Sequence, residues 1–176
     1  VGIGGIGMSG LARYFHAHGS AVSGYDRTAS PLTSSLQELG ISICTSANGL
    51  EIDADFKAWL ALTARAERAV IRTPAVPENF QILQAARQVH CPVLKRSELL
   101  GKLTRNHPTL AVAGTHGKTT TSALLAHLMM GRPEGCRAFI GGVLSAQESN
   151  VIWSEGAQWT VVEADEFDRS FLELDP

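Results

Sequence analysis

Short apolar runs alternate with apolar residues at helical spacing along the first hundred residues of the chain. The runs predict strands at residues 1–3, 21–25, 41–44, 69–73 and 92–94. The helical spacing predicts helices over segments 8–15, 32–39, 55–64, 82–89 and 99–103. Ser30 followed by Pro31 predicts the N-cap and the first turn of the second helix. This alternation predicts an α/β domain with a parallel sheet and helices on its faces.

A polar stretch at residues 105–108, which contains a proline, separates these elements from a second group. Here we predict a strand at 110–113 and then a helix with four apolar residues on one face, Leu124, Leu125, Leu128 and Met129. A further apolar strand at 159–163 leads into acidic residues. The polar stretch therefore marks a predicted boundary between two domains, which span 1–105 and 106–176.

The second predicted domain and both chain ends indicate a larger protein. About 70 residues follow the boundary, fewer than the roughly 100–150 that are typical of a domain. Val1 leads directly into a glycine-rich turn, as the last part of a strand would, and no capping signal follows Glu173. We therefore expect the second domain to be incomplete and a C-terminal domain to lie outside this sequence.

Composition and charge narrow the classes of function. Hydrophobic residues make up 44% of the 176 residues and charged residues 18%, which excludes a disordered chain. No apolar stretch approaches the roughly 20 residues of a membrane helix, so we expect a cytoplasmic protein without membrane partners. A net charge of -2 provides no broad basic surface for nucleic acid, so the expected partners are small molecules. The cysteines Cys44, Cys91 and Cys136 form no CxxC pair, which predicts buried free thiols.

Three glycines, Gly2, Gly4 and Gly7, occupy the predicted turn between the first strand and helix, and Asp26 ends the next strand. Glycine permits a tight turn and lets a diphosphate approach the free N–H groups of the helix. An acid at the end of the next strand is placed to meet a ribose. The pattern predicts a nucleotide-diphosphate site, and a purely structural tight turn is the alternative.

A second glycine loop joins the predicted strand at 110–113 to the following helix. Its residues are Gly114, Thr115, His116, Gly117, Lys118, Thr119 and Thr120. In such loops backbone N–H groups hold phosphates, a lysine neutralises β- and γ-phosphate charge, and a hydroxyl binds Mg²⁺. Val112 stands where the usual Gly-x4-Gly-Lys spacing needs glycine, so the loop matches a shorter variant. We predict an ATP site with Mg²⁺, against the alternative of a chance Gly-Lys-Thr at a helix start.

Glu163 ends the apolar strand at 159–163 and is a predicted metal ligand beside Thr119. A phosphate loop needs a carboxylate on a neighbouring strand, because Mg²⁺ prefers oxygen ligands. Asp165, Glu166 and Asp168 follow closely along the chain. The alternative for all four acids is a solvated acidic turn.

Five segments of the chain together resemble the bacterial Mur ligases. They are Gly2-Ile-Gly-Gly-Ile-Gly-Met-Ser-Gly10, Ser23-Gly-Tyr-Asp26, Thr73-Pro-Ala-Val76, Gly114-Thr-His-Gly-Lys-Thr-Thr-Thr121 and Glu163-Ala-Asp-Glu-Phe-Asp-Arg-Ser-Phe171. They follow the family's order over nearly the whole chain. The combination is most similar to the members that add L-alanine, and the related muramoyl-tripeptide recycling ligases are the nearest alternative. Tyr25 and residues 45–68 depart from the family pattern.

The resemblance implies an ATP-dependent ligase that joins L-alanine to UDP-N-acetylmuramate through an acyl phosphate, in peptidoglycan precursor synthesis. It implies a Rossmann-like domain for the UDP sugar, followed by an incomplete P-loop ATPase-type α/β domain for ATP and Mg²⁺. The implied UDP-sugar residues are Gly4, Gly5, Ile6, Gly7, Met8, Ser9, Asp26, Thr73, Pro74 and Ala75. Lys118 would stabilise charge on the transferring phosphoryl group. Without a C-terminal domain, this chain alone is expected to bind the UDP sugar and to form no product.

Two other classes of function use part of the same pattern. A nicotinamide or flavin oxidoreductase would use the glycine turn and Asp26, but it gives no role to Lys118 or Glu163. A non-catalytic nucleotide sensor would bind ATP without a carboxylate substrate. NADH binding without ATP hydrolysis would favour the oxidoreductase, and ADP release that depends on UDP-N-acetylmuramate separates a ligase from a sensor.

Overall fold

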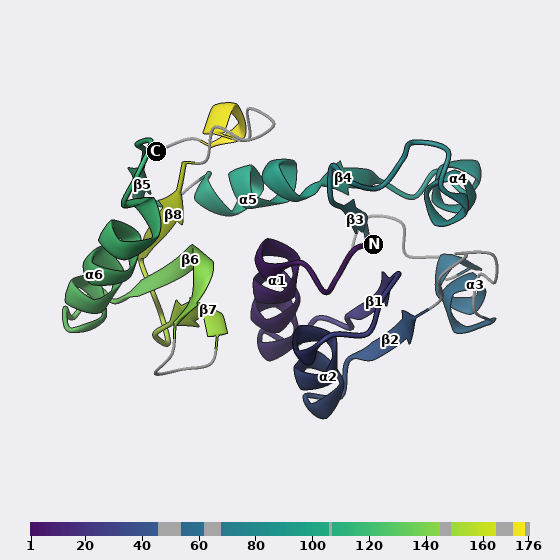
Figure 1. The fold of residues 1–176 in the computed structure, drawn as a ribbon, viewed down its shortest axis with the longest axis horizontal. Helices are drawn as coiled ribbons and strands as arrows, with labels where there is room; N and C mark the ends of the chain where they lie inside the picture. Colours follow the sequence, from purple (N-terminus) through teal and green to yellow (C-terminus); the bar gives the residue numbers. More distant parts are fainter. Residues whose placement is uncertain (46–53, 62–67, 106, 145–148, 165–170, 175–176) are drawn as a thin grey trace.

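The computed structural model describes residues 1–45, 54–61, 68–105, 107–144, 149–164 and 171–174. The first part contains α1 (Ile6–Ala17), β1 (Ser23–Asp26), α2 (Pro31–Glu38), β2 (Ser42–Thr45), α3 (Ala54–Ala61), β3 (Val70–Arg72), α4 (Gln81–Gln88), β4 (Val93–Lys95) and α5 (Arg96–Thr104). The second contains β5 (Thr109–Val112), α6 (Lys118–Met130), β6 (Cys136–Leu144), β7 (Ser149–Trp153) and β8 (Trp159–Glu163). The chain is therefore mixed α/β, as predicted (Figure 1).

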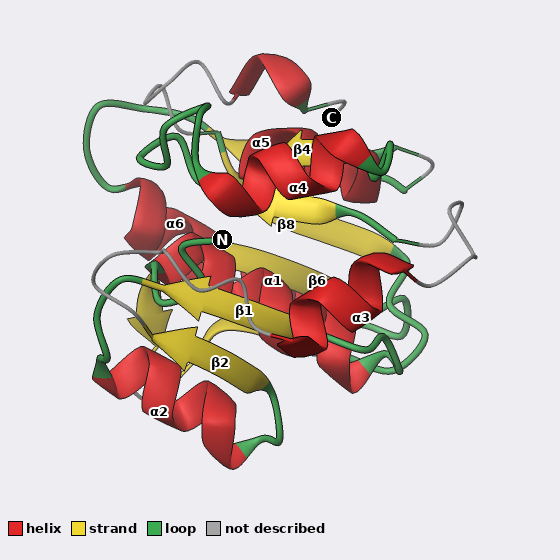
Figure 2. Ribbon diagram, turned by 90° about the vertical axis from the view of Figure 1, so that its right-hand side faces the viewer, coloured by secondary structure: helices red, strands yellow, loops and turns green. Residues whose placement is uncertain are grey.

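Local sequence signals account for several of these boundaries. Ser30 caps α2, since its Oγ accepts a hydrogen bond from the Thr33 N–H at 3.3 Å. The Ser30 N–H donates in return to Thr33 Oγ1 at 2.8 Å, and Pro31 opens the helix. The predicted cap is thus confirmed, and α2 lies beside β2 (Figure 2).

Residues 1–3 join two parallel strand pairs into one row. Within the described residues, β1 pairs with β2 and β3 pairs with β4, both in parallel. The Gly2 N–H donates to the Tyr25 carbonyl of β1 at 2.7 Å, and the Val1 nitrogen donates to the Ile71 carbonyl of β3 at 2.6 Å. The N-terminal residues therefore lie between β1 and β3 (Figure 1), where the predicted first strand belongs.

A second sheet has the strand order β5-β8-β6-β7. In it β5, β8 and β6 are parallel, while β7 is antiparallel to β6. Sequence analysis predicted β5 and β8 and missed β6 and β7. Residues 136–140 of β6 are all buried, so they show no alternation of apolar and polar positions, and Gly141 and Gly142 then interrupt the run.

Helix α1 lies between the two sheets (Figure 1). On one side it contributes Ala12 to a cluster with Ile3, Leu36 and Ile41. On the other side, Leu11 and Tyr14 share a buried cluster with Leu100 of α5 and with Phe139, Val151 and Val162 of the second sheet. Residues of both predicted domains therefore share one buried apolar cluster on this side of α1.

Only two of the four residues predicted to form the apolar face of α6 pack against the second sheet. Leu125 and Met129 pack against the second sheet, as expected. Leu124 and Leu128 are instead 62% and 68% exposed, so their placement on that face was wrong. The buried positions of the helix include Ser122 and Ala126, whose small side chains let the helix approach β6 and β8 closely.

The three cysteines are free thiols, as predicted, with Cys91 and Cys136 buried and Cys44 only half-buried. Burial raises the pKa of the Cys91 and Cys136 thiols. Over the described ranges, no helix combines the length and the hydrophobicity that crossing a membrane requires.

Candidate functional site

The glycine-rich turn between residues 1–3 and α1 lies against the Thr73 loop. Gly2 has a φ of +80°, in the left-handed region that favours glycine. A Cβ atom at Gly2 would lie 3.0 Å from Thr73 Cγ2. Thr73, in the loop predicted to contact the substrate, therefore lies beside the start of the glycine turn, where residues 1–3 run next to β3.

Asp26 fastens this turn to β1. Its Oδ2 accepts a hydrogen bond from the Gly4 N–H at 2.7 Å, and its Oδ1 accepts one from the Thr28 N–H at 3.2 Å. A Cβ at Gly4 would lie 2.9 Å from Oδ2, so only glycine fits there without displacing the carboxylate. The acid that the sequence assigned to a ribose therefore also holds the turn in shape.

Three glycines spaced three residues apart each face a polar side chain from a different element. Gly4 meets Asp26 of β1, while Gly7 meets Arg96, the first residue of α5. Gly10 meets Asn150 of β7, whose Nδ2 lies 2.6 Å from the position of an added Cβ. Sequence analysis missed Arg96 and Asn150, and the regular spacing of the glycines was the only available signal.

An exposed ion-pair cluster supports the loop that carries Thr73, Pro74 and Ala75. The Glu78 carboxylate pairs with both Arg72 and Arg87. The hydrogen bond from Arg87, together with the positive charge of Arg72, holds the pKa of Glu78 below its ordinary value. Arg72 also donates to the Val76 carbonyl at 3.4 Å, so the cluster connects β3, the loop and α4.

The second glycine loop leads from β5 into α6. Gly114 and Gly117 have φ values of 142° and 77°, and Gly117 is the N-cap of α6. The Lys118 Nζ donates to the Gly114 carbonyl at 2.7 Å, which folds the side chain back over its own loop. The first N–H groups of α6 point toward this loop, because a helix leaves its first four donors without intrahelical partners.

Thr119 and Glu163, the two predicted metal ligands, each lie against one of two neighbouring glycines in β6. The Gly141 N–H donates to Glu163 Oε1 at 2.9 Å, and a Cβ at Gly142 would lie 3.0 Å from Thr119 Cγ2. Glu163 reaches this position because it pairs in register with Val112 at the end of β5. A hydroxyl and a carboxylate are hard oxygen donors, so this pair fits Mg²⁺. Asp165, Glu166 and Asp168 lie outside the described residues.

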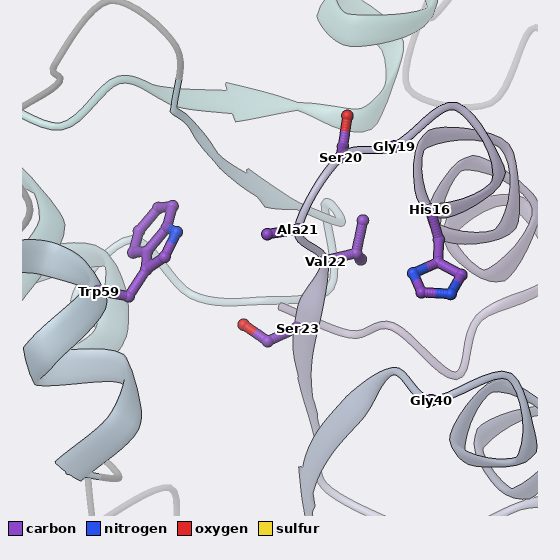
Figure 3. A pocket seen from close by; sticks show the side chains of 8 residues that line it. All are labelled: His16, Gly19, Ser20, Ala21, Val22, Ser23, Gly40 and Trp59. Carbon is purple, nitrogen blue, oxygen red and sulfur yellow. The ribbon is translucent and has the colours of Figure 1, made fainter.

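Two surface hollows lie away from these turns. One, of about 530 Å³, has His16, Ser23 and Trp59 among its lining residues (Figure 3) and lies at the end of β1 opposite Asp26. The other, of about 690 Å³, lies between α1, α6 and β7. No predicted site residue lines either hollow. The candidate sites are therefore the two glycine turns at the carboxyl ends of parallel strands, where α/β proteins bind ligands.

Comparisons with known proteins identify the family of the chain. Residues 1–108 match the family model described as "Mur ligase family, catalytic domain". A UDP-N-acetylmuramate–L-alanine ligase of Parabacteroides distasonis is 48% identical over 176 residues, and one of Flavobacterium psychrophilum is 49% identical. Both alignments cover 100% of this chain, which spans only 37% and 38% of the two relatives.

Solved structures show the same fold. A UDP-N-acetylmuramate-alanine ligase from Thermotoga maritima superimposes with a TM-score of 0.78 at 30% identity, covering 99% of this chain and 38% of that one. The UDP-N-acetylmuramate:L-alanyl-gamma-D-glutamyl-meso-diaminopimelate ligase from Neisseria meningitides gives 0.74 at 26% identity, covering 96% of this chain and 52% of that one. These matches favour a ligase over an oxidoreductase. With most of its length matched by the family model, the chain belongs to the Mur ligase family.

Proposed function

We propose that this chain provides the UDP-sugar site and part of the MgATP site of a ligase that joins L-alanine to UDP-N-acetylmuramate. The observation that carries the proposal is that Glu163 and Thr119, the residue after Lys118, lie against the neighbouring glycines Gly141 and Gly142. The names of the Parabacteroides and Flavobacterium relatives support these substrates. Since the chain spans little more than a third of those relatives, the proposal concerns the full-length protein.

The first turn provides the UDP-sugar site. Gly4, Gly5, Ile6, Gly7, Met8 and Ser9 bring the N-terminus of α1 to the diphosphate, where free N–H groups and the helix dipole favour negative charge. Thr73, whose side chain lies against Gly2 at the start of this turn, contacts the uridine together with Pro74, Ala75 and Asp26. The side chains of Asp26 and Thr73 meet the turn before substrate arrives, so the site is preorganised.

The second loop is a short P-loop that holds the ATP phosphates. Backbone N–H groups from Gly114 to Thr120 surround the phosphates, and Lys118 exchanges the Gly114 carbonyl for phosphate oxygens. The Thr119 hydroxyl and the Glu163 carboxylate hold Mg²⁺. When bound, Mg²⁺ supplies positive charge that stabilises the transferring phosphoryl group. The Gly141 N–H keeps the Glu163 carboxylate oriented toward the loop.

The reaction we propose is the one that the resemblance to the Mur ligases implies. A muramoyl carboxylate oxygen attacks the γ-phosphorus of ATP, the bond to the bridging oxygen breaks, and ADP leaves. The amine of L-alanine then attacks the resulting acyl phosphate, loses a proton and displaces inorganic phosphate. Lys118 acts electrostatically and forms no covalent bond. The substrates of both sites are cytoplasmic.

The test is a ligase assay on the full-length protein with UDP-N-acetylmuramate, ATP, Mg²⁺ and a panel of amino acids. The panel contains L-alanine, glycine, L-serine and a muramoyl-type tripeptide. We expect ADP release that requires the UDP sugar, and a product that contains L-alanine. Preferred incorporation of the tripeptide, or ADP release that ignores the UDP sugar, would contradict the proposal.

A further inference from the structure

We propose that Arg96 binds the diphosphate of the UDP sugar, as the charged partner of the glycine turn. The inference rests on the proposed function and adds to it a residue that belongs to neither glycine motif. Arg96 lies 89 positions beyond Gly7 along the chain (96 minus 7), yet the fold brings its side chain to the first turn of α1.

The contact between Arg96 and Gly7 is close and specific. A Cβ atom at Gly7 would lie 3.0 Å from Arg96 Cδ, 3.1 Å from Nη1 and 3.2 Å from Nε. The glycine therefore leaves the space that the guanidinium group occupies. Gly7 is the second residue of α1, so the positive charge lies where the helix presents its free N–H groups.

The position of Arg96 within its own helix is electrostatically unfavourable. It is the first residue of α5, where the helix dipole favours acids and disfavours cations. Glu98, the acid of this first turn, accepts a hydrogen bond from the Lys95 N–H at 2.7 Å. Among the residues that the structure describes, none accepts a hydrogen bond from the half-buried Arg96, and none forms an ion pair with it. A cation in this position contributes little to the stability of the fold and can bind an anionic ligand.

The first turn of α1 offers matching donors. Met8 and Ser9 donate their N–H groups to the Gly5 carbonyl, while the N–H groups of Ile6 and Gly7 have no acceptor within the described part of the chain. The first turn of α1 also contains no acidic residue. Two backbone donors and a planar guanidinium group thus lie at the first turn of α1. A diphosphate, with two negative charges and several oxygen acceptors, fits this set, and arginine binds such groups through two N–H bonds at once.

The experiment measures binding to the full-length protein by calorimetry. Its variants are Arg96→Met, which keeps an unbranched apolar stem and removes the charge, and Arg96→Lys, which keeps the charge. Lys95→Met is the matched control, because Lys95 is the neighbouring exposed cation on the same helix end. The ligands are UDP-N-acetylmuramate, UDP and a non-hydrolysable ATP analogue with Mg²⁺.

We expect Arg96→Met to weaken UDP and UDP-N-acetylmuramate binding by at least about tenfold, the scale of one charge-assisted contact, and Arg96→Lys to restore part of the loss. Binding of the ATP analogue and the affinities of the Lys95→Met variant should stay at wild-type values. The affinity of Arg96→Met for UDP should also depend less on salt than that of the wild type.

Equal UDP affinities for wild type and Arg96→Met would overturn the role of Arg96 while leaving the ligase proposal intact. A wild-type protein that binds no UDP sugar would instead overturn the proposed function itself. If Arg96→Met also lowers the melting temperature, the UDP affinity of Arg96→Lys relative to wild type decides whether the charge of Arg96 binds the diphosphate. A purely structural role predicts that both variants lose affinity for UDP and for the ATP analogue together.

Discussion

The side-chain amide of Asn150 donates a hydrogen bond to the main-chain carbonyl of Ile6, and this bond joins β7 to the first residue of α1. Asn150 is buried, and Ser9 donates to the same carbonyl at 2.8 Å. Nearby, the buried Arg137 donates to the Tyr14 hydroxyl at 3.0 Å and to the Leu103 carbonyl at 2.8 Å. Polar contacts therefore join β6 and β7 of the second sheet to α1 and to Leu103 of α5.

Replacing Asn150 by alanine should destabilise the protein by roughly 1–3 kcal/mol, because it removes a buried hydrogen bond and leaves a small cavity against Gly10. Thermal or urea unfolding measures the loss. The control is Gln84→Ala at an exposed position of α4, which should change the unfolding free energy by no more than about 0.5 kcal/mol. Equal stabilities of the two variants would show that the bond to Ile6 contributes nothing.

Lys118→Ala should lower turnover of the full-length ligase by roughly 10²-fold or more, since it removes a cation that stabilises charge in the transition state. UDP-N-acetylmuramate should bind the variant as tightly as it binds wild type. Lys102→Ala, at an exposed position of α5, is the matched control and should retain full turnover. Near-normal turnover of Lys118→Ala would remove the lysine from the mechanism.

Glu163→Gln tests the metal role separately from the fold. Glutamine keeps the acceptor oxygen for the Gly141 N–H but is a weaker ligand for a hard cation. The Mg²⁺ concentration needed for half-maximal activity should rise, while the unfolding free energy changes by no more than about 1 kcal/mol. Glu155→Gln, at an exposed site, should leave the Mg²⁺ titration unchanged. A wild-type titration curve for Glu163→Gln would support the solvated-turn interpretation.

The ion-pair cluster at Glu78 should make stability depend on pH in acid. Its pairing with Arg87 and Arg72 lowers the pKa of Glu78 in the folded protein relative to the unfolded chain. The contribution is therefore complete above the unfolded pKa of about 4.3, and it is lost as the pH falls through the lower, folded pKa. Melting curves between pH 3 and pH 6 measure the effect.

A Glu78→Gln variant lacks this titration, so its melting temperature should approach that of wild type as the pH falls. Glu38→Gln, at the exposed end of α2, provides the comparison and should follow the wild-type curve. A constant difference in melting temperature between wild type and Glu78→Gln across this range would contradict the pairing.

Periodicity predicted most of the fold because the relevant apolar faces were regular. The helix that Ser30 caps and the strand that ends at Glu163 lie where the pattern placed them. The pattern failed where burial was not periodic, as in β6, and where adjacent leucines left the buried face of α6 ambiguous. Leu124 and Leu125 lie about 100° apart around a helix, so composition alone did not determine which one faces the sheet.

The candidate site was predicted as far as its residues belong to short motifs. Gly117, Lys118 and Thr119 are contiguous, so the sequence alone predicts the turn from the loop into α6. Arg96 and Asn150 are single polar residues within unremarkable segments, and their importance arises only from long-range packing on Gly7 and Gly10. Apart from the regular spacing of the glycines, the sequence carries no local signal for such contacts.

The packing of side chains on Gly4, Gly7 and Gly10 changes what a glycine motif reports. Each of these glycines is crowded by a side chain of the protein itself, so each position would need glycine even if no nucleotide ever bound. Glycine and its neighbour form an interdependent pair, since a side chain at position 7 would require the Arg96 side chain to shift. The motif is thus a record of internal crowding, which explains how one glycine pattern suits proteins that take up quite different nucleotides.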